Sequence, residues 1–138
     1  MLRTLFVKDF AIIDGADVNF ASGMSVLTGE TGAGKSLLVD ALMLLAGGRG
    51  DAGVVRHGAE RAEMSAEFDL RALPAPRAWL REQELDDEEH VRLRRVIRAD
   101  GSSRAWINDR PVSLAVLREA AAFHSTVWNA TWECNATL

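Results

Sequence analysis

One segment of the chain combines residue types and spacing that suit the binding of phosphate groups. Residues 29–36 read Gly-Glu-Thr-Gly-Ala-Gly-Lys-Ser, which fits the pattern G-x-x-x-x-G-K-[ST]. Glycines let the backbone fold around an anion so that successive N–H groups point inward. The Lys35 ammonium can then reach the β- and γ-phosphates of a nucleotide, and the Ser36 hydroxyl can bind Mg²⁺. The predicted cofactor-binding residues are Gly29, Glu30, Thr31, Gly32, Ala33, Gly34, Lys35 and Ser36, with Ser36 also the metal ligand.

The flanking segments are the ones that such a loop requires. Residues 23–28 are apolar enough for a strand inside a sheet, and residues 35–46 have a helical pattern that is apolar on nearly every side. A helix that begins at the loop presents its positive end to the phosphates. A glycine-rich turn that merely happens to hold Lys-Ser is the alternative, and this strand–loop–helix context disfavours it.

Residues for cleaving the nucleotide are not evident. A phosphate-loop ATPase also needs a carboxylate at the end of an apolar strand to hold Mg²⁺ and orient water. Asp40 follows three apolar residues, but it lies in the predicted helix after the loop. Asp14 also follows three apolar residues, in a short strand that we expect to break at Gly15, where a turn aspartate is the simpler interpretation. No catalytic residue is therefore predicted.

The rest of the chain predicts an α/β fold with a mixed sheet, a hairpin and a buried helix after the loop. Strands are expected at 2–10, at 11–13 with 16–20, and at 63–70. A hairpin is expected from 91–99 and 104–108 around Asp100-Gly101. Helices are expected over 74–84 and after Ser113, a plausible N-cap.

Arginines cluster in the first strand of this hairpin. Arg92, Arg94 and Arg98 share one face, while Arg95 falls on the face of the apolar residues. A solvated face plus one paired Arg95 is the favoured interpretation. Contact with a phosphate backbone is the alternative.

Composition bounds the function. The 138 residues carry a net charge of −4, which gives no support for direct nucleic-acid binding, and the single cysteine excludes an internal disulfide. The N-terminal residues lack a signal-peptide pattern, and no apolar run is long enough to span a bilayer. We expect a cytoplasmic protein with no membrane partner.

The character of the chain changes at about residue 120. Residues 120–138 hold the only cysteine and no arginine, although the chain has fourteen arginines among its sixteen basic residues. We interpret 120–138 as a tail, out of frame or disordered, that follows one domain over 1–119.

A series of motifs in order along residues 1–119 resembles the amino-terminal part of the RecN family of bacterial DNA repair proteins. The motifs include Phe-Ala-Ile-Ile-Asp at 10–14, Leu-Thr-Gly-Glu-Thr-Gly-Ala-Gly-Lys-Ser at 27–36 and Val-Arg-His-Gly at 55–58. Asp-Gly-Ser-Ser-Arg-Ala-Trp-Ile-Asn at 100–108 and Arg-Pro-Val-Ser-Leu at 110–114 continue the series. The ordered set is more specific than the phosphate loop alone.

The resemblance implies a phosphate-loop NTPase fold, namely the N-terminal lobe of an ATPase head of the ABC and SMC type. It implies binding of ATP and Mg²⁺, head–head self-association, and a role in double-strand-break repair and recombination at the nucleoid. Contact with DNA is then expected only through the full-length protein. The family continues with a segment whose glutamine acts near the metal, and residues 123–126 do not match it. We therefore expect a truncated or frameshifted member that binds ATP without hydrolysing it alone.

Two other functions stay open at this point. One is a small, self-sufficient phosphate-loop phosphotransferase, for which the hairpin around Arg92–Arg110 would have to serve as a lid. The other is a truncated fragment with no function of its own.

Overall fold

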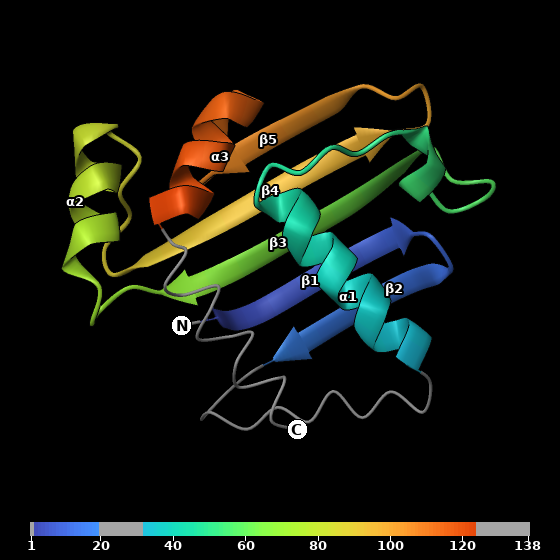
Figure 1. Cartoon of the computed structure of the whole chain (residues 1–138), viewed down its shortest axis with the longest axis horizontal. Helices are drawn as coiled ribbons and strands as arrows, with labels where there is room; N and C mark the ends of the chain where they lie inside the picture. The colour runs from blue at the N-terminus through green and yellow to red at the C-terminus, as the bar shows by residue number, and fades with distance from the viewer. Residues whose placement is uncertain (1, 20–31, 124–138) are drawn as a thin grey trace.

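The computed structural model describes residues 2–19 and 32–123, and its central feature is a six-stranded sheet (Figure 1). The strand order is β2-β1-β3-β4-β5-β6, and every described pair of neighbours is antiparallel. The strands are β1 (Leu2–Phe10), β2 (Ile13–Asn19), β3 (Arg61–Asp69), β4 (His90–Arg98), β5 (Ser103–Ile107) and β6 (Arg110–Val112). The mixed sheet that the sequence predicts depends on residues 23–28, which lie outside the described residues.

The first hairpin differs from the predicted one. The sequence predicts a strand interrupted at Asp14-Gly15, whereas β2 runs through both residues and pairs Gly15 with Lys8. The chain reverses earlier, where Ala11 takes a positive φ of 52° and Ile12 is 78% exposed. Backbone pairing with β1 fixes Gly15 in the sheet, although glycine alone favours a break.

The strands alternate between a buried and an open face. One transverse row joins Leu5, Ala66, Leu93 and Ile107 on β1, β3, β4 and β5, and each is at most 1% exposed. The next row along the strands joins Phe6, Ser65, Arg94 and Trp106, all partly exposed. This alternation is the expected pattern for an antiparallel sheet with one covered face.

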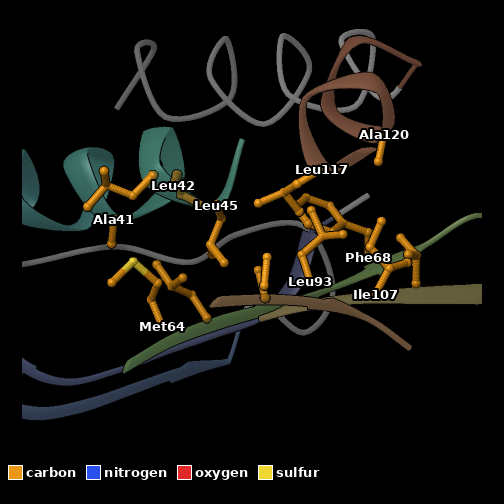
Figure 2. Packing of buried hydrophobic residues seen from close by; sticks show 14 of the residues in the cluster. Ala41, Leu42, Leu45, Met64, Phe68, Leu93, Ile107, Leu117 and Ala120 are labelled. Carbon is orange, nitrogen blue, oxygen red and sulfur yellow. The ribbon is translucent and has the colours of Figure 1, made fainter. Parts of the chain in front are cut away.

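Helices α1 (Gly32–Leu45) and α3 (Leu114–Phe123) lie on the buried face of the sheet (Figures 1 and 2). Leu45 of α1 and Leu117 of α3 are fully buried there and point toward the strands. Replacing such a leucine by alanine typically costs about 2–5 kcal/mol. Leu45 therefore contributes strongly to holding α1 on the sheet, and Leu117 does the same for α3. Ser113 caps α3 as predicted, since its hydroxyl accepts a hydrogen bond from Val116 N–H at 3.2 Å.

The remaining helix, α2 (Pro74–Glu82), lies beside α3 at the end of the sheet where β3 ends and β4 begins (Figure 1). It buries Trp79 and Leu80 and ends two residues before the predicted Glu84, which takes a positive φ of 57°. Helix α3 continues to Phe123, and Ala120 and Ala121 are buried. The predicted division between 119 and 120 therefore falls within a helix. The division itself stays a prediction, because 124–138 lie outside the described residues.

Candidate nucleotide-binding site

The predicted phosphate loop meets the described structure at the N-terminal end of α1. Gly32–Leu45 form the helix, so Gly32, Ala33, Gly34, Lys35 and Ser36 make up its first turn. Gly29, Glu30 and Thr31, together with the side chains of residues 32–36, lie outside the described part. The helix begins three residues before the predicted Lys35, because glycines carry no apolar pattern that could mark an earlier start.

The backbone of this first turn suits an anion. The first four N–H groups of a helix have no partner within the helix, and the helix dipole places partial positive charge there. The first turn of α1 contains no acidic residue that would occupy these groups. The backbone of this turn is therefore of a kind that can hold a phosphate.

Burial fixes α1 along one side. Leu38, Ala41 and Leu45 are 8%, 0% and 0% exposed and face the sheet. Asp40 and Met43 are exposed on the opposite side. Asp40 thus lies in a helix, as the sequence predicts, and on its solvent side.

The C-terminal end of α1 is held by a buried arginine. Arg95 of β4 is 1% exposed and donates from Nη1 to the carbonyl of Leu44 at 2.8 Å and to the carbonyl of Gly48. Its Nε donates to Ser103 Oγ at 3.0 Å. The predicted pairing of Arg95 is therefore made with helix-end carbonyls, not with a carboxylate. A cation at a helix C-terminus is favoured by the helix dipole.

A second arginine reaches the same turn from α3. Arg118 Nε donates to the carbonyl of Gly47 at 2.9 Å. Burial lowers the pKa of Arg95 below its usual value, and the positive charge of Arg118 lowers it further. We call Arg95 and Arg118 the helix-end arginines. Sequence reasoning missed their shared role because backbone carbonyls, which every residue has, are the acceptors.

Asp14, the other carboxylate considered for metal binding, is exposed and paired. Its Oδ1 accepts from Arg56 Nη1 at 2.9 Å, and its side chain is 82% exposed. The segment around Arg56 is also tied to β1, since Arg56 N–H donates to the Asp9 carbonyl at 2.9 Å. Asp14 is thus part of a surface ion pair in a strand, where the sequence predicts a turn.

Two of the hairpin arginines on the open face, Arg92 and Arg94, have a glutamate partner, and Arg98 forms no ion pair within the described residues. Arg94 Nε donates to Glu63 Oε1 at 2.7 Å and stacks on Trp106, with 4.5 Å from Cζ to the ring centroid. Arg92 lies 3.4 Å from Glu67. Arg98 is exposed. The hairpin is paired to β3 along nine residues of β4, so this part of the chain is integral to the sheet.

Two kinds of feature are absent from residues 2–19 and 32–123. No group of three or more His, Cys, Asp and Glu side chains comes together in a way that could hold a metal ion. No helix of this part is both long and apolar enough to cross a membrane.

The sequence is similar to known proteins over most of its length. A sequence model of the AAA domain family matches residues 4–116. The DNA repair protein RecN of Xylella fastidiosa (strain Temecula1) is 59% identical over 121 residues, which is 88% of this chain and 22% of that protein. RecN of Haemophilus influenzae is 48% identical over 126 residues, 89% of this chain and 23% of that protein. The chain thus spans under a quarter of the length of these relatives.

Solved structures share the fold. A structure from work on ATP-driven dimerization and DNA-stimulated activation of SMC ATPases has a TM-score of 0.70 at 23% identity, covering 88% of this chain and 79% of that one. An Smc head bound to the C-winged helix domain of ScpA has a TM-score of 0.70 at 21% identity, covering 88% and 40%. The recombination mediator protein RecF-ATPrS has a TM-score of 0.62 at 18% identity, covering 85% and 29%. The predicted fold class, an N-terminal lobe of an SMC-type ATPase head, is confirmed.

Proposed function

Since the chain belongs to the AAA domain family and is homologous to the DNA repair protein RecN, we propose that it binds a nucleotide. The nucleotide would be ATP with Mg²⁺, bound at the N-terminal end of α1. Lys35 would contact the β- and γ-phosphates, and Ser36 would be a Mg²⁺ ligand. The backbone N–H groups of residues 29–36 would surround the phosphates. Mg²⁺ would neutralise phosphate charge when bound.

One observation carries the proposal. The motif residues Gly32–Ser36 form the first turn of a helix whose buried side and whose C-terminal end are both fixed to the sheet. Such a helix presents its N–H groups in a fixed direction, so little ordering is left for binding. A helix N-terminus held in place in this way favours a bound phosphate.

The wider role follows from the relatives. We propose that this segment acts within a longer RecN-type protein in the repair of DNA double-strand breaks at the nucleoid. ATP binding would promote association of two heads, by analogy with the ATP-driven dimerization studied in SMC ATPases. The isolated segment would bind ATP without turnover, because its sequence offers no carboxylate or glutamine in the pattern that phosphate-loop ATPases use to hold the metal and orient water.

A nucleotide titration tests the site. We would measure the affinity of the chain for a fluorescent ATP analogue with Mg²⁺, in the wild type and in Lys35→Ala. Loss of a charge-assisted contact of about 1.5–3 kcal/mol lowers affinity by roughly 10- to 100-fold. Lys8→Ala is the matched control, because Lys8 is the other lysine of the chain and is exposed on β1.

Two results would contradict the proposal. If Lys35→Ala and Lys8→Ala bind the ATP analogue with equal affinity, the phosphate loop is not the nucleotide-binding site. Steady ATP hydrolysis by the isolated wild-type chain that Lys35→Ala abolishes would show that the site is complete without further segments.

A further inference from the structure

Three exposed arginines meet at one corner of the open face of the sheet. Arg61 of β3 and Arg98 of β4 are directly opposite in the strand register. Arg104 of β5 is opposite Val96, which makes it the diagonal neighbour of Arg98. Cross-strand neighbours are about 5 Å apart at Cβ and diagonal ones about 7–8 Å. We call Arg61, Arg98 and Arg104 the arginine corner.

The corner faces away from α1 and α3. Each of its residues alternates with a buried one on the other face: Ala62 beside Arg61, Ile97 beside Arg98 and Ala105 beside Arg104. Since α1 and α3 cover that buried face (Figure 1), the corner and the N-terminal end of α1 are on separate surfaces. Binding at one need not block binding at the other.

Within the described residues no carboxylate forms an ion pair with the corner. Glu63, the nearest acidic residue along β3, accepts from Arg94 at 2.7 Å. Asp100 in the hairpin turn accepts from the N–H and the hydroxyl of Ser102 at 2.8 and 2.6 Å. These bonds lower the pKa of Asp100, with a smaller contribution from the charge of Arg98.

Like charges that have no ion-pair partner oppose folding. Two like charges directly opposite on neighbouring strands are destabilising, so the Arg61–Arg98 pair reduces stability in the free protein. An anion bound between the strands would relieve that repulsion. The other arginines of this face illustrate the contrast, since Arg92 and Arg94 each have a glutamate partner.

We propose that the arginine corner binds the phosphodiester backbone of DNA. Guanidinium groups pair with phosphate through two parallel N–H bonds, and arginines on three adjacent strands offer several such pairs on an open surface. The neighbouring row of the same face carries Arg94 stacked on Trp106, and arginine and aromatic side chains together are typical of nucleic-acid surfaces. An acidic protein segment is the competing occupant.

The choice of DNA over RNA rests on the proposed function in DNA repair, whereas the choice of a phosphate backbone rests on the arginines. The net charge of −4 does not oppose this, because the basic residues act locally over about a Debye length of 8–10 Å. The family resemblance implies DNA contact only through a full-length protein. On the present proposal this sheet face would supply part of that contact.

The test is a fluorescence anisotropy titration of a labelled DNA duplex of about 20 base pairs at low salt and across a salt series. The triple variant Arg61→Gln, Arg98→Gln, Arg104→Gln is compared with a control of equal charge change, Arg3→Gln, Arg81→Gln, Arg110→Gln. All six arginines are exposed. Each phosphate contact contributes about 0.9 to the slope of log affinity against log salt, so the corner triple should lose about 2–3 from that slope and at least about tenfold in affinity.

Several outcomes would overturn the proposal. Indistinguishable slopes for the two triple variants would remove the corner as the contact. Absence of duplex binding by the wild type at low salt would do the same, and binding of a poly-glutamate peptide instead would assign the corner to an acidic protein segment. Single variants such as Arg98→Gln provide the same comparison if a triple variant does not fold.

A parallel Mg-ATP titration separates this inference from the proposed function. Both triple variants should bind the nucleotide as the wild type does, because neither changes residues 29–36. If the wild type binds the duplex but does not bind Mg-ATP, only the ATP site is contradicted. Intact ATP binding without duplex binding would contradict only the corner.

Discussion

The guanidinium of Arg95 and the carbonyl of Leu44, 51 residues apart in the chain, are joined by a buried hydrogen bond of 2.8 Å. The bond connects β4 with the C-terminal end of α1, at the opposite end of that helix from the phosphate-loop residues. Arg95 is the one charged side chain among the described residues that is fully buried. Its acceptors are the Leu44 and Gly48 carbonyls and the hydroxyl of Ser103.

Replacing Arg95 by methionine should destabilise the fold strongly. The change keeps much of the side-chain volume but removes the charged donor from the Leu44 and Gly48 carbonyls, although the Leu44 carbonyl keeps the Gly47 N–H as a partner. A hydrogen bond to a charged group contributes about 1.5–3 kcal/mol. We expect a decrease in the free energy of unfolding of about 2–4 kcal/mol, measured by urea titration. Arg92→Met, on the same strand with a half-exposed side chain, should change it by less than about 1 kcal/mol. Equal effects of the two changes would contradict the role of Arg95.

Substitution of Gly47 by alanine should disturb the contact with Arg118. Gly47 has φ of +90°, and an added Cβ would lie 2.4 Å from Arg118 Cγ. Gly58 has a similar φ of +85° with nothing within 4 Å, so Gly58→Ala measures the backbone strain alone, about 1–2 kcal/mol. Thermal unfolding of both variants should show a larger decrease in melting temperature for Gly47→Ala than for Gly58→Ala. A loss no larger than that of Gly58→Ala would mean that Arg118 moves aside at no cost.

The side chain of Asn108, in the loop that follows β5, should stabilise the fold through two hydrogen bonds to the backbone. Its Oδ1 accepts from the Arg92 N–H at 2.8 Å and its Nδ2 donates to the Leu85 carbonyl at 2.6 Å. Asn108→Asp keeps the acceptor but sets a carboxylate oxygen against a carbonyl, which should cost about 1–3 kcal/mol in urea unfolding at neutral pH. The control Asp109→Asn changes the adjacent exposed residue and should stay within about 0.5 kcal/mol.

The carboxyl of Asp69 should titrate at unusually low pH. Hydrogen bonds from the side chain and then the backbone N–H of Arg71 lower the pKa of Asp69 to about 2. Because the folded pKa is below the ordinary 3.8, this pair stabilises the fold above about pH 4, and the contribution is lost as pH falls toward 2. An NMR titration of the Asp69 carboxyl should return toward the ordinary value in Arg71→Ala. Arg71 is 67% exposed, so solvent screening should keep the stability difference below about 1 kcal/mol. An unchanged titration in Arg71→Ala would contradict the pairing.

The features that depend on local order could be predicted from the residues alone. The phosphate loop is eight consecutive residues, so its pattern is readable without a fold, and the strands and helices follow from alternation and from caps such as Ser113. The apolar pattern of the helix after the loop predicts burial, and Leu38, Ala41 and Leu45 of this helix are buried. Local periodicity carries this information because side chains two, three or four residues apart share a face.

Contacts between groups far apart in the chain became visible only in the folded protein. Pairing with β1 carries β2 through Asp14 and Gly15, where local preference favours a turn. Arg95 and Arg98 are three residues apart in one strand, yet one binds helix-end carbonyls in the core and the other lies exposed opposite Arg61. Backbone carbonyls have no sequence signature, and strand register sets which charges are adjacent. Both depend on contacts between residues far apart in the chain, which residue patterns alone do not specify.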